Sequence, residues 1–288
     1  MSKVLVTGGA GFIGSHLVDY LIDKGHEVIV MDNLISGKME NVNDKARTYF
    51  HYDIQYFDVI NETITHEKPD IIFHLAAVSR TPWAIQDPRY TYGTNVLGSA
   101  NILEAARQAG VGKVVLASSN IVYAARTPYR TSKEAMELVA RDYNDLYDLP
   151  TLCLRFSNVY GQVGNIPLRQ HPDNVLMALS ESKRKEGKIK ISGDGEQTRN
   201  FTHVSDICEA LWLASQSDVR GDEIDIMNGK LWSLNEVAKF YNCPIEYIPD
   251  RKGDIKHLKM TGPDKAKELL GFEAKRDLAD NISVYTNV

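Results

Sequence analysis

The first half of the chain alternates short apolar runs with segments of helical periodicity. Five apolar runs are predicted as buried strands: Val4–Thr7, Glu27–Met31, Ile71–Leu75, Val114–Ala117 and Thr151–Phe156. Apolar residues at helical spacing predict helices over Ile13–Ile22, which Gly25 ends, and near Asn95–Ala109 and Tyr129–Tyr147. This alternation predicts βαβ units, and therefore an α/β fold with a Rossmann-type, doubly wound parallel sheet.

Beyond Phe156 the periodicity weakens, because proline, glycine and charged residues are scattered from Gly161 to Gly195. We expect a second, smaller domain there. One unit would comprise residues 1–155 and about 200–228, and the other about 156–199 and 229–288. The later elements that we predict are a helix over Thr202–Ala214, a strand over Glu223–Met227, and helices over Leu234–Tyr241 and Asp264–Leu270.

The composition is that of a folded globular protein. The chain has 288 residues, of which 43% are hydrophobic and 25% are charged. Its net charge of -5 gives no general attraction to nucleic acid or to an anionic membrane, so we expect neither as a partner. No apolar run approaches the ~18 residues of a membrane span, and the stretch Met1–Val6 is too short for a signal peptide.

The cysteines and histidines suggest no metal or disulfide chemistry. Three widely spaced cysteines fit neither a disulfide framework nor a zinc site, which favours a reducing cytoplasm. The eight histidines form no HExxH motif and no pair at helical spacing, so no metal is expected.

A glycine-rich turn, Thr7–Gly14, lies between the first predicted strand and helix. Such a turn lets a dinucleotide pyrophosphate approach the backbone N–H groups and the positive end of the helix. The expected cofactor contacts in this turn are Gly8, Gly11, Phe12, Ile13 and Gly14.

Asp32 ends the second predicted strand, 18 residues after Gly14. A carboxylate there can accept hydrogen bonds from both hydroxyls of the adenine ribose, and it would repel a 2'-phosphate. The next residue, Asn33, is no arginine that could bind such a phosphate, so NAD is favoured over NADP. Asp53 and Ile54 could lie around the adenine, although an ordinary surface aspartate at 53 is nearly as plausible.

Tyr129 and Lys133 are four residues apart, so on a helix they share one face. The ammonium group would favour the phenolate and lower a pKa that is ordinarily ~10, making Tyr129 a base for a hydroxyl group. The pair follows the strand that ends at Ser118 and Ser119, and ligands of open α/β sheets bind at those strand ends. Tyr20 and Lys24 have the same spacing at the end of the first helix, and they serve as an internal control.

Several motifs together resemble the extended short-chain dehydrogenase/reductases, in particular the NAD-dependent nucleotide-sugar epimerase/dehydratase group. They are TGGAGFIG at 7–14, MDN at 31–33, FHLAA at 73–77, SSNIVY at 118–123, YRTSK at 129–133, LRFSNVYG at 154–161, GDGEQTRNFTHVSD at 193–206 and RKGD at 251–254. The resemblance implies that the first unit binds NAD and the second a nucleotide-diphosphate sugar, and that the protein is a homodimer packed through the helices near Asn95 and Tyr129.

The resemblance also implies residue roles. Tyr129 is the base, Lys133 holds the nicotinamide ribose, and Ser119 contacts the sugar 4-hydroxyl. Further cofactor contacts are Leu75, Ala76, Ala77 and Asn95, and further substrate contacts are Ser79, Asn158, Arg199, Arg251 and Leu258. Of these, Asn158, Arg199 and Arg251 match contacts to the diphosphate, and Leu258 lies where the family gates the sugar 2-substituent. The chain departs from the family between Tyr123 and Tyr129, where the connection is short.

Three functions remain open from the sequence. The first is epimerisation at C4 of a nucleotide-diphosphate sugar, most simply a UDP-hexose or UDP-N-acetylhexosamine. The second is a 4,6-dehydratase, decarboxylase or reductase of the same family, and the third is a non-catalytic NAD-binding or nucleotide-sugar-binding protein. Asn120 and Ile121 favour the first, because dehydration needs an additional acid and base and neither side chain can supply them.

Overall fold

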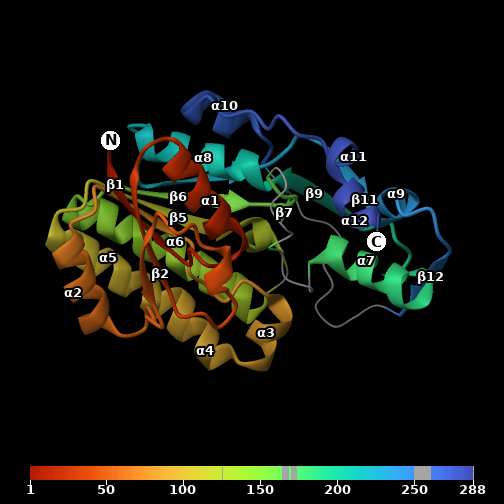
Figure 1. Ribbon diagram of the computed structural model, residues 1–288, viewed down its shortest axis with the longest axis horizontal. Coiled ribbons are helices and arrows are strands. Elements are labelled where there is room, and N and C mark those ends of the chain that lie inside the picture. The colour runs from red at the N-terminus through yellow and green to blue at the C-terminus, as the bar shows by residue number, and fades with distance from the viewer. Residues whose placement is uncertain (125, 164–168, 170–173, 250–260, 288) are drawn as a thin grey trace.

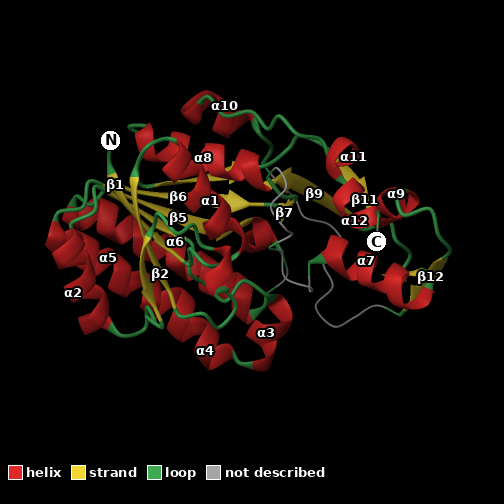
Figure 2. Cartoon of the chain, in the orientation of Figure 1, coloured by secondary structure: helices red, strands yellow, loops and turns green. Residues whose placement is uncertain are grey.

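The computed structural model describes residues 1–124, 126–163, 169, 174–249 and 261–287. Its centre is a sheet of seven parallel strands in the order β10-β6-β5-β4-β1-β2-β3 (Figures 1 and 2). The strands are β1 (Lys3–Thr7), β2 (Glu27–Asp32), β3 (Arg47–Phe50), β4 (Ile71–His74), β5 (Lys113–Ser119), β6 (Thr151–Phe156) and β10 (Asp222–Ile226). The strand order reverses direction between β1 and β4, which is where ligands bind in such sheets.

Helices cover both faces of this sheet, as the doubly wound prediction requires. Side chains of a strand alternate between faces, so Val4 and Val6 pack into one core and Leu5 packs into the other. The first core includes α1 (Phe12–Asp23), α8 (Val204–Gln216) and α10 (Asp264–Leu270), and the second includes α2 (Phe57–Glu67), α5 (Gly98–Ala109) and α6 (Pro128–Tyr147). The predicted fold class is therefore confirmed.

A smaller group of elements lies beyond one end of the main sheet, on the right in Figure 1. It has a three-stranded sheet, β11-β9-β7, a two-stranded sheet, β12-β8, and its own core around the buried rings of Tyr160, Phe201, Tyr241 and Tyr285. Its elements are β7 (Asn158–Tyr160), α7 (Val175–Glu186), β8 (Ile189–Ser192), β9 (Thr198–His203), β11 (Leu231–Ser233), α9 (Leu234–Lys239), β12 (Ile245–Ile248), α11 (Leu278–Asn281) and α12 (Ser283–Thr286).

Two helices start two or more residues later than the sequence predicts. The helix expected from Thr202 begins at Val204, because residues 198–203 form β9 and pair with β7 and β11. The helix expected from Asn95 begins at Gly98, after a π-helical turn over Gly93–Leu97. In both places strand pairing or tertiary packing overrides the local periodicity.

Short elements lie between strands of the main sheet along the chain. They are η1 (Met39–Asn41), α3 (Thr81–Gln86), α4 (Pro88–Tyr92) and η3 (Asn120–Tyr123). Within the described residues, none of the helices combines the length and the apolar character that crossing a bilayer would require.

Candidate active site

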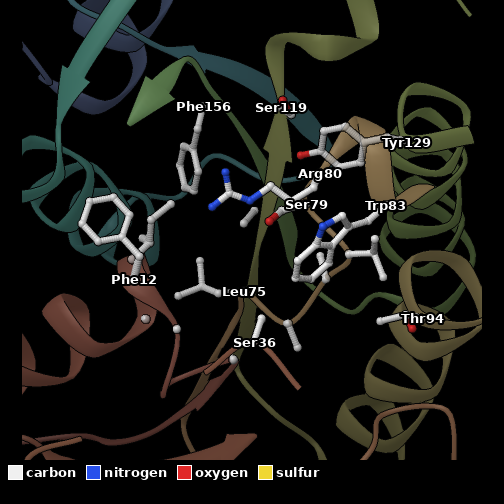
Figure 3. Close-up of a pocket in the computed structure, with 18 of the residues that line it drawn as sticks. Phe12, Ser36, Leu75, Ser79, Arg80, Trp83, Thr94, Ser119, Tyr129 and Phe156 are labelled. Atoms are coloured by element: carbon white, nitrogen blue, oxygen red, sulfur yellow. The ribbon is translucent and has the colours of Figure 1, made fainter. Parts of the chain in front are cut away.

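A cleft of about 1040 Å³ opens at the carboxyl ends of the central strands. Its walls come from the glycine turn after β1, the end of β2, the loop after β4, the end of β5, the start of α6, and the β7 and β9 strands of the smaller group. Figure 3 shows side chains from the start of α1, the loop after β4, the end of β5 and the start of α6 around one space. Elements far apart in the sequence therefore build a single site.

The glycine turn has the geometry that a close backbone approach needs. Gly8 has a φ of +71°, and a Cβ there would lie 2.7 Å from the backbone nitrogen of Ala76. A Cβ at Gly14 would collide with the carbonyl oxygen of Gly8. Gly11 caps α1 without a side-chain hydrogen bond, so backbone groups define this helix end, and Phe12 and Ile13 line the cleft beside it. The turn fits a dinucleotide pyrophosphate at a helix N-terminus.

Asp32 lies at the end of β2 with 7% of its surface exposed, and it lines the cleft. Burial raises the pKa of Asp32, and the N–H groups of Leu34 and Ala10 act in the opposite direction by donating to its carboxylate over 2.8 Å and 2.9 Å. These two bonds fix the carboxylate while leaving lone pairs for ribose hydroxyls. The residues present at this end of the cleft thus fit the adenosine half of NAD.

The predicted adenine contacts divide into two kinds. Ile54 and Asn33 line the cleft, whereas Asp53 is outside the set of lining residues that the structure describes. The Asp53 carboxylate instead accepts hydrogen bonds from the Asn33 side chain, at 3.2 Å, and from the Gln55 N–H, at 2.9 Å. Asp53 therefore orients Asn33, and a direct adenine contact from this carboxylate stays a prediction.

A buried hydrogen-bond chain holds the loop after β4, whose residues Leu75, Ala76, Ala77 and Ser79 line the cleft. Ser99 donates to the carbonyl of Asn95, so it accepts from Nε2 of His74 at 2.9 Å, and Nδ1 of His74 then accepts from Thr7 at 2.7 Å. Burial, with the nearby charge of Lys133, lowers the pKa of His74 to about 3. A neutral histidine thus fixes the loop against the glycine turn.

Asn95 holds the same loop from the other side and does not itself line the cleft in the described structure. Its amide bonds both the N–H and the carbonyl of Val78, at 2.7 Å and 2.9 Å, and donates to Ser132 at 2.9 Å. Ser132 in turn donates to the carbonyl of Tyr129. Asn95 thus ties the loop to α6, and the direct cofactor contact that the resemblance implies stays a prediction.

Tyr129 and Ser119 meet across the cleft. Tyr129 follows the N-cap Thr127 and Pro128 at the start of α6, and Ser119 ends β5 and caps η3. Burial raises the pKa of Tyr129, whereas a hydrogen bond with Ser119 and the positive charge of Arg80 act in the opposite direction. The expected lowering below the ordinary value is therefore wrong for the protein alone, because only 9% of this residue is exposed and desolvation dominates.

Lys133 lies one turn further along α6, lines the cleft and is 4% exposed. Its ammonium group donates to the carbonyl of Ala117 at 2.7 Å, and burial lowers the pKa of Lys133 to about 8. That Lys133 tunes Tyr129 stays a prediction.

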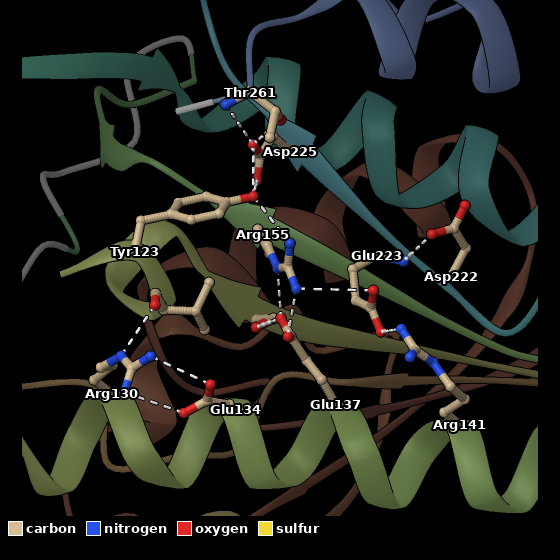
Figure 4. A network of polar contacts seen from close by, with 12 residues as sticks. Tyr123, Arg130, Glu134, Glu137, Arg141, Arg155, Asp222, Glu223, Asp225 and Thr261 are labelled. Atoms are coloured by element: carbon tan, nitrogen blue, oxygen red, sulfur yellow. Dashed lines mark hydrogen bonds and ion pairs between the residues drawn. The ribbon is translucent and has the colours of Figure 1, made fainter. Parts of the chain in front are cut away.

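Beneath the cleft, a polar network anchors α6 to the sheet (Figure 4). Glu137 accepts from Ser118, at 2.5 Å, and forms a two-pronged ion pair with Arg155, at 2.6 Å and 2.8 Å. Arg155 also donates to the Tyr123 hydroxyl, which bonds the Asp225 carboxylate at the edge of the sheet. The network fixes the strand end that carries Ser119.

The substrate end of the cleft contains two of the predicted diphosphate contacts, Asn158 and Arg199. The Asn158 side chain donates to the carbonyl of Asn200 and the Arg199 guanidinium to the carbonyl of Thr198, at 3.1 Å and 2.8 Å. Arg251 and Leu258 lie outside the described residues. Sequence reasoning missed Arg80, Trp83 and Arg169, which also line the cleft, because no motif or spacing signal marks them in the sequence.

The fold and the cleft together define an enzyme that binds a nicotinamide dinucleotide at the switch point of a doubly wound sheet. Within the described residues no three histidine, cysteine, aspartate or glutamate side chains gather into a possible metal site. The sequence profile of the NAD-dependent epimerase/dehydratase family matches residues 4–228. The chain belongs to this family, and NAD is its cofactor.

Individual relatives agree with this assignment. The chain is 33% identical to the UDP-glucose 4-epimerase of Mycolicibacterium smegmatis, over 98% of this chain and 96% of the relative. A UDP-glucose 4-epimerase of Thermotoga maritima, solved with UDP-glucose, superposes with a TM-score of 0.90 at 31% identity, covering 99% and 97% of the two chains. A dTDP-glucose 4,6-dehydratase of Streptomyces venezuelae, solved with NAD bound, gives 0.88 at 28% identity, covering 99% and 96%. Both reactions therefore occur on this fold.

Proposed function

We propose that this enzyme catalyses epimerisation at C4 of a nucleotide-diphosphate sugar through a 4-keto intermediate. The substrate would be a UDP-hexose or a UDP-N-acetylhexosamine. The observation that carries the proposal is the pairing of Tyr129 with Ser119 at a position where Asn120 and Ile121, rather than acidic residues, come next.

The proposed reaction follows from the protons and hydrogen bonds that these side chains can accept or donate. Tyr129 accepts the proton of the sugar 4-hydroxyl, and the Ser119 hydroxyl hydrogen-bonds the same oxygen and the phenol. NAD, when bound, supplies a reversible hydride acceptor. The 4-keto sugar must then present its other face before Tyr129 returns the proton, so the reaction has no net redox change. Lys133 would hold the nicotinamide ribose, and Asp32 would hold the adenine ribose.

The substrate diphosphate would lie at the opposite end of the cleft from the glycine turn. Asn158 and Arg199 line that end, and an arginine with an amide donor suits diphosphate oxygens. Arg251 and Leu258 keep their expected roles as proposals, at the diphosphate and at the sugar 2-substituent. The UDP-glucose bound to the Thermotoga relative supports a uridine nucleotide for this chain.

Among the described residues that line the cleft, we find no suitable acid and base near Tyr129 for the dehydratase alternative. Loss of water across C5 and C6 needs a base for the C5 proton and an acid for the leaving hydroxyl. The acidic residues among the described lining residues are Asp32, which the N–H groups of Ala10 and Leu34 fix at the end of β2, and Asp87, which caps α4. Glu137 is engaged by Ser118 and Arg155 beneath the cleft.

Incubating the NAD-loaded enzyme with UDP-glucose, UDP-N-acetylglucosamine, GDP-mannose and dTDP-glucose, and resolving the products, tests the proposal. We expect interconversion of C4 epimers with at least one UDP-sugar. Denaturing the purified protein should release NAD, and reconstitution should favour NAD over NADP because of Asp32. A turnover that requires added NAD(P)H in stoichiometric amount would contradict an internal redox cycle.

We also propose a homodimer packed through α5 and α6. Leucine side chains at the start of α5 and on α6 support this assembly, since Leu97 is 54% exposed and Leu138 is 57% exposed. Sedimentation analysis of the full chain should give a dimer, and Leu138→Arg should shift it to a monomer because the charge would be buried in the interface. A monomer in the unmodified protein would rule the assembly out.

A further inference from the structure

One tyrosine hydroxyl ties the turn that follows Ser119 to the sheet. Figure 4 shows the Tyr123 side chain extending from η3, with its hydroxyl between Arg155 on β6 and Asp225 on β10. We propose that Tyr123 is a positioning residue that keeps the Ser119 hydroxyl oriented as a hydrogen-bond donor toward the reacting oxygen. The inference rests on the proposed function, in which Ser119 hydrogen-bonds the sugar 4-hydroxyl.

The hydrogen bonds of the Tyr123 hydroxyl can run in only one direction. A guanidinium has donors only, so the Tyr123 oxygen accepts from Arg155 at 2.9 Å. The Tyr123 proton must therefore go to the Asp225 carboxylate, whose two oxygens lie 3.0 Å and 3.1 Å away. One donor and one acceptor thus hold the hydroxyl from two sides.

Both partners of this hydroxyl are fixed in the sheet. Asp225 lies within β10, is 2% exposed, and stands directly opposite Arg155 in the pairing of β10 with β6. The Asp225 carboxylate also accepts from the N–H and the hydroxyl of Thr261, and Arg155 pairs with Glu137 on α6 at 2.6 Å. The position of the Tyr123 hydroxyl is therefore set by the sheet.

The turn η3 connects this fixed hydroxyl to Ser119. It spans only the four residues Asn120–Tyr123, and the N–H of Ala124 closes it by donating to the carbonyl of Ile121 at 2.9 Å. The N–H of Ile121 donates to the Ser119 hydroxyl oxygen at 3.2 Å. With that N–H on its oxygen, Ser119 keeps its own proton for a hydrogen bond into the cleft. A movement of Tyr123 should therefore disturb the bond that orients Ser119.

A second contact should keep η3 folded when the Tyr123 hydroxyl is removed. Arg130 on α6 donates to the carbonyl of Val122 at 3.0 Å, so the turn is also held from the helix side. We therefore expect Tyr123→Phe to loosen the turn and to leave the protein folded. The consequence for Ser119 is a loss of orientation, which can be measured at the Ile121 N–H.

The direct test follows hydrogen exchange of that N–H by NMR, in the NAD-loaded full chain without substrate. The protein carries isotope-labelled isoleucine, and Ser119→Ala identifies the Ile121 signal because it removes the acceptor. We expect Tyr123→Phe to speed exchange at Ile121 by roughly tenfold, the effect of weakening one hydrogen bond.

Tyr241→Phe is the matched control for this measurement. It removes a buried tyrosine hydroxyl that donates to the carbonyl of Leu176 at 2.8 Å, in the smaller group of elements. Exchange at Ile121 should be unchanged in this variant. An unchanged exchange rate at Ile121 in Tyr123→Phe would overturn the proposal.

A kinetic cycle tests whether Tyr123 acts through Ser119. With UDP-glucose as the probe, Tyr123→Phe should lower kcat by roughly fivefold with KM nearly unchanged. In a Ser119→Ala background the same change should have no further effect, because the group that it positions is already gone. Equal losses in both backgrounds would overturn the proposal. If the unmodified enzyme turns over no UDP-sugar, the proposed function fails, and the exchange measurement still decides the role of Tyr123.

Discussion

The chain contains two tyrosine–lysine pairs with identical spacing in very different surroundings. Tyr20 and Lys24 lie at the end of α1, where the lysine is exposed and its ammonium sits 4.9 Å from the centre of the tyrosine ring. Tyr129 and Lys133 lie at the start of α6, where both residues are buried and line the cleft. The two pairs share their sequence signal and differ in every feature that chemistry would use.

The contrast shows that location, rather than spacing, distinguishes the two pairs. Burial, with the nearby Glu209, raises the pKa of Tyr20 to about 12, and no hydrogen-bond partner from a strand end acts on it. The Tyr129 phenol forms a hydrogen bond with Ser119, which ends β5 at the carboxyl edge of the sheet. A helix that starts at this edge places its first turn over the ligand, whereas the end of α1 is remote from it.

The largest expected difference is in catalysis. Tyr129→Phe should lower kcat with the best UDP-sugar by about 10²–10⁴-fold, because it removes the group that exchanges the hydroxyl proton, while NAD remains bound. Tyr20→Phe should leave kcat nearly unchanged. Steady-state kinetics and the NAD content of both variants check this, and equal losses in the two would mean that the pairs are not functionally distinct.

The contrast between buried and exposed groups extends to the ion pairs of α6. Glu137→Gln should lower the free energy of unfolding by about 3 kcal/mol, because the Arg155 charge would lose its carboxylate partner in a largely buried setting. Glu134→Gln alters an exposed pair with Arg130 and should cost less than about 1 kcal/mol. Urea unfolding of the two variants measures both values. Similar small losses would show that the network in Figure 4 does not anchor the helix.

Lys133 and Lys24 should differ in how they make the free energy of unfolding depend on pH. Burial lowers the pKa of Lys133 to about 8 in the folded protein, so between roughly pH 8 and 10 the unfolded chain binds more protons and stability rises with pH. The buried charge of Lys133 destabilises the folded protein fully below pH 8. Between pH 8 and 10 this destabilisation falls by about 2 kcal/mol.

Unfolding curves of the NAD-free protein at several pH values would show this effect. In Lys133→Met the free energy of unfolding should increase less between pH 8 and 10. Lys24→Met should show the same pH dependence as the unmodified protein, because Lys24 is exposed in both the folded and the unfolded state. Lys113, whose pKa is also lowered by burial to about 8, contributes equally to all three proteins. Parallel curves for Lys133→Met and the unmodified protein would contradict the burial argument.

The parts of the site that the sequence predicted well are those that a local sequence pattern marks. The glycine turn, Asp32, Ser119 and Tyr129 are tied to a strand end or a helix start by local pattern, and all line the cleft. Arg80 has no such signal, since a loop arginine becomes relevant only when the sheet brings it to the cleft. The direction of the Tyr129 pKa was missed for the same reason, because burial is a tertiary property.

Two further differences have the same physical origin. The buried amide of Asn95 bonds Val78 and Ser132, which lie in segments that sequence spacing does not bring together, so its role in holding the loop is not predictable from the sequence. The start of α8 was placed two residues early, because residues 198–203 are held in β9 by pairing with strands far away in the sequence. In both cases contacts between residues far apart in the sequence determine the local structure.

The central claim, that Tyr129 and NAD act on C4 alone, is tested most directly with UDP-glucose deuterated at C4. We predict a product of unchanged mass that is the C4 epimer and still carries deuterium at C4, because the hydrogen removed from that carbon is returned to it. Mass spectrometry and NMR of the purified product read both properties. A product lighter by one water, with the deuterium at C6, would contradict the account and identify a 4,6-dehydratase.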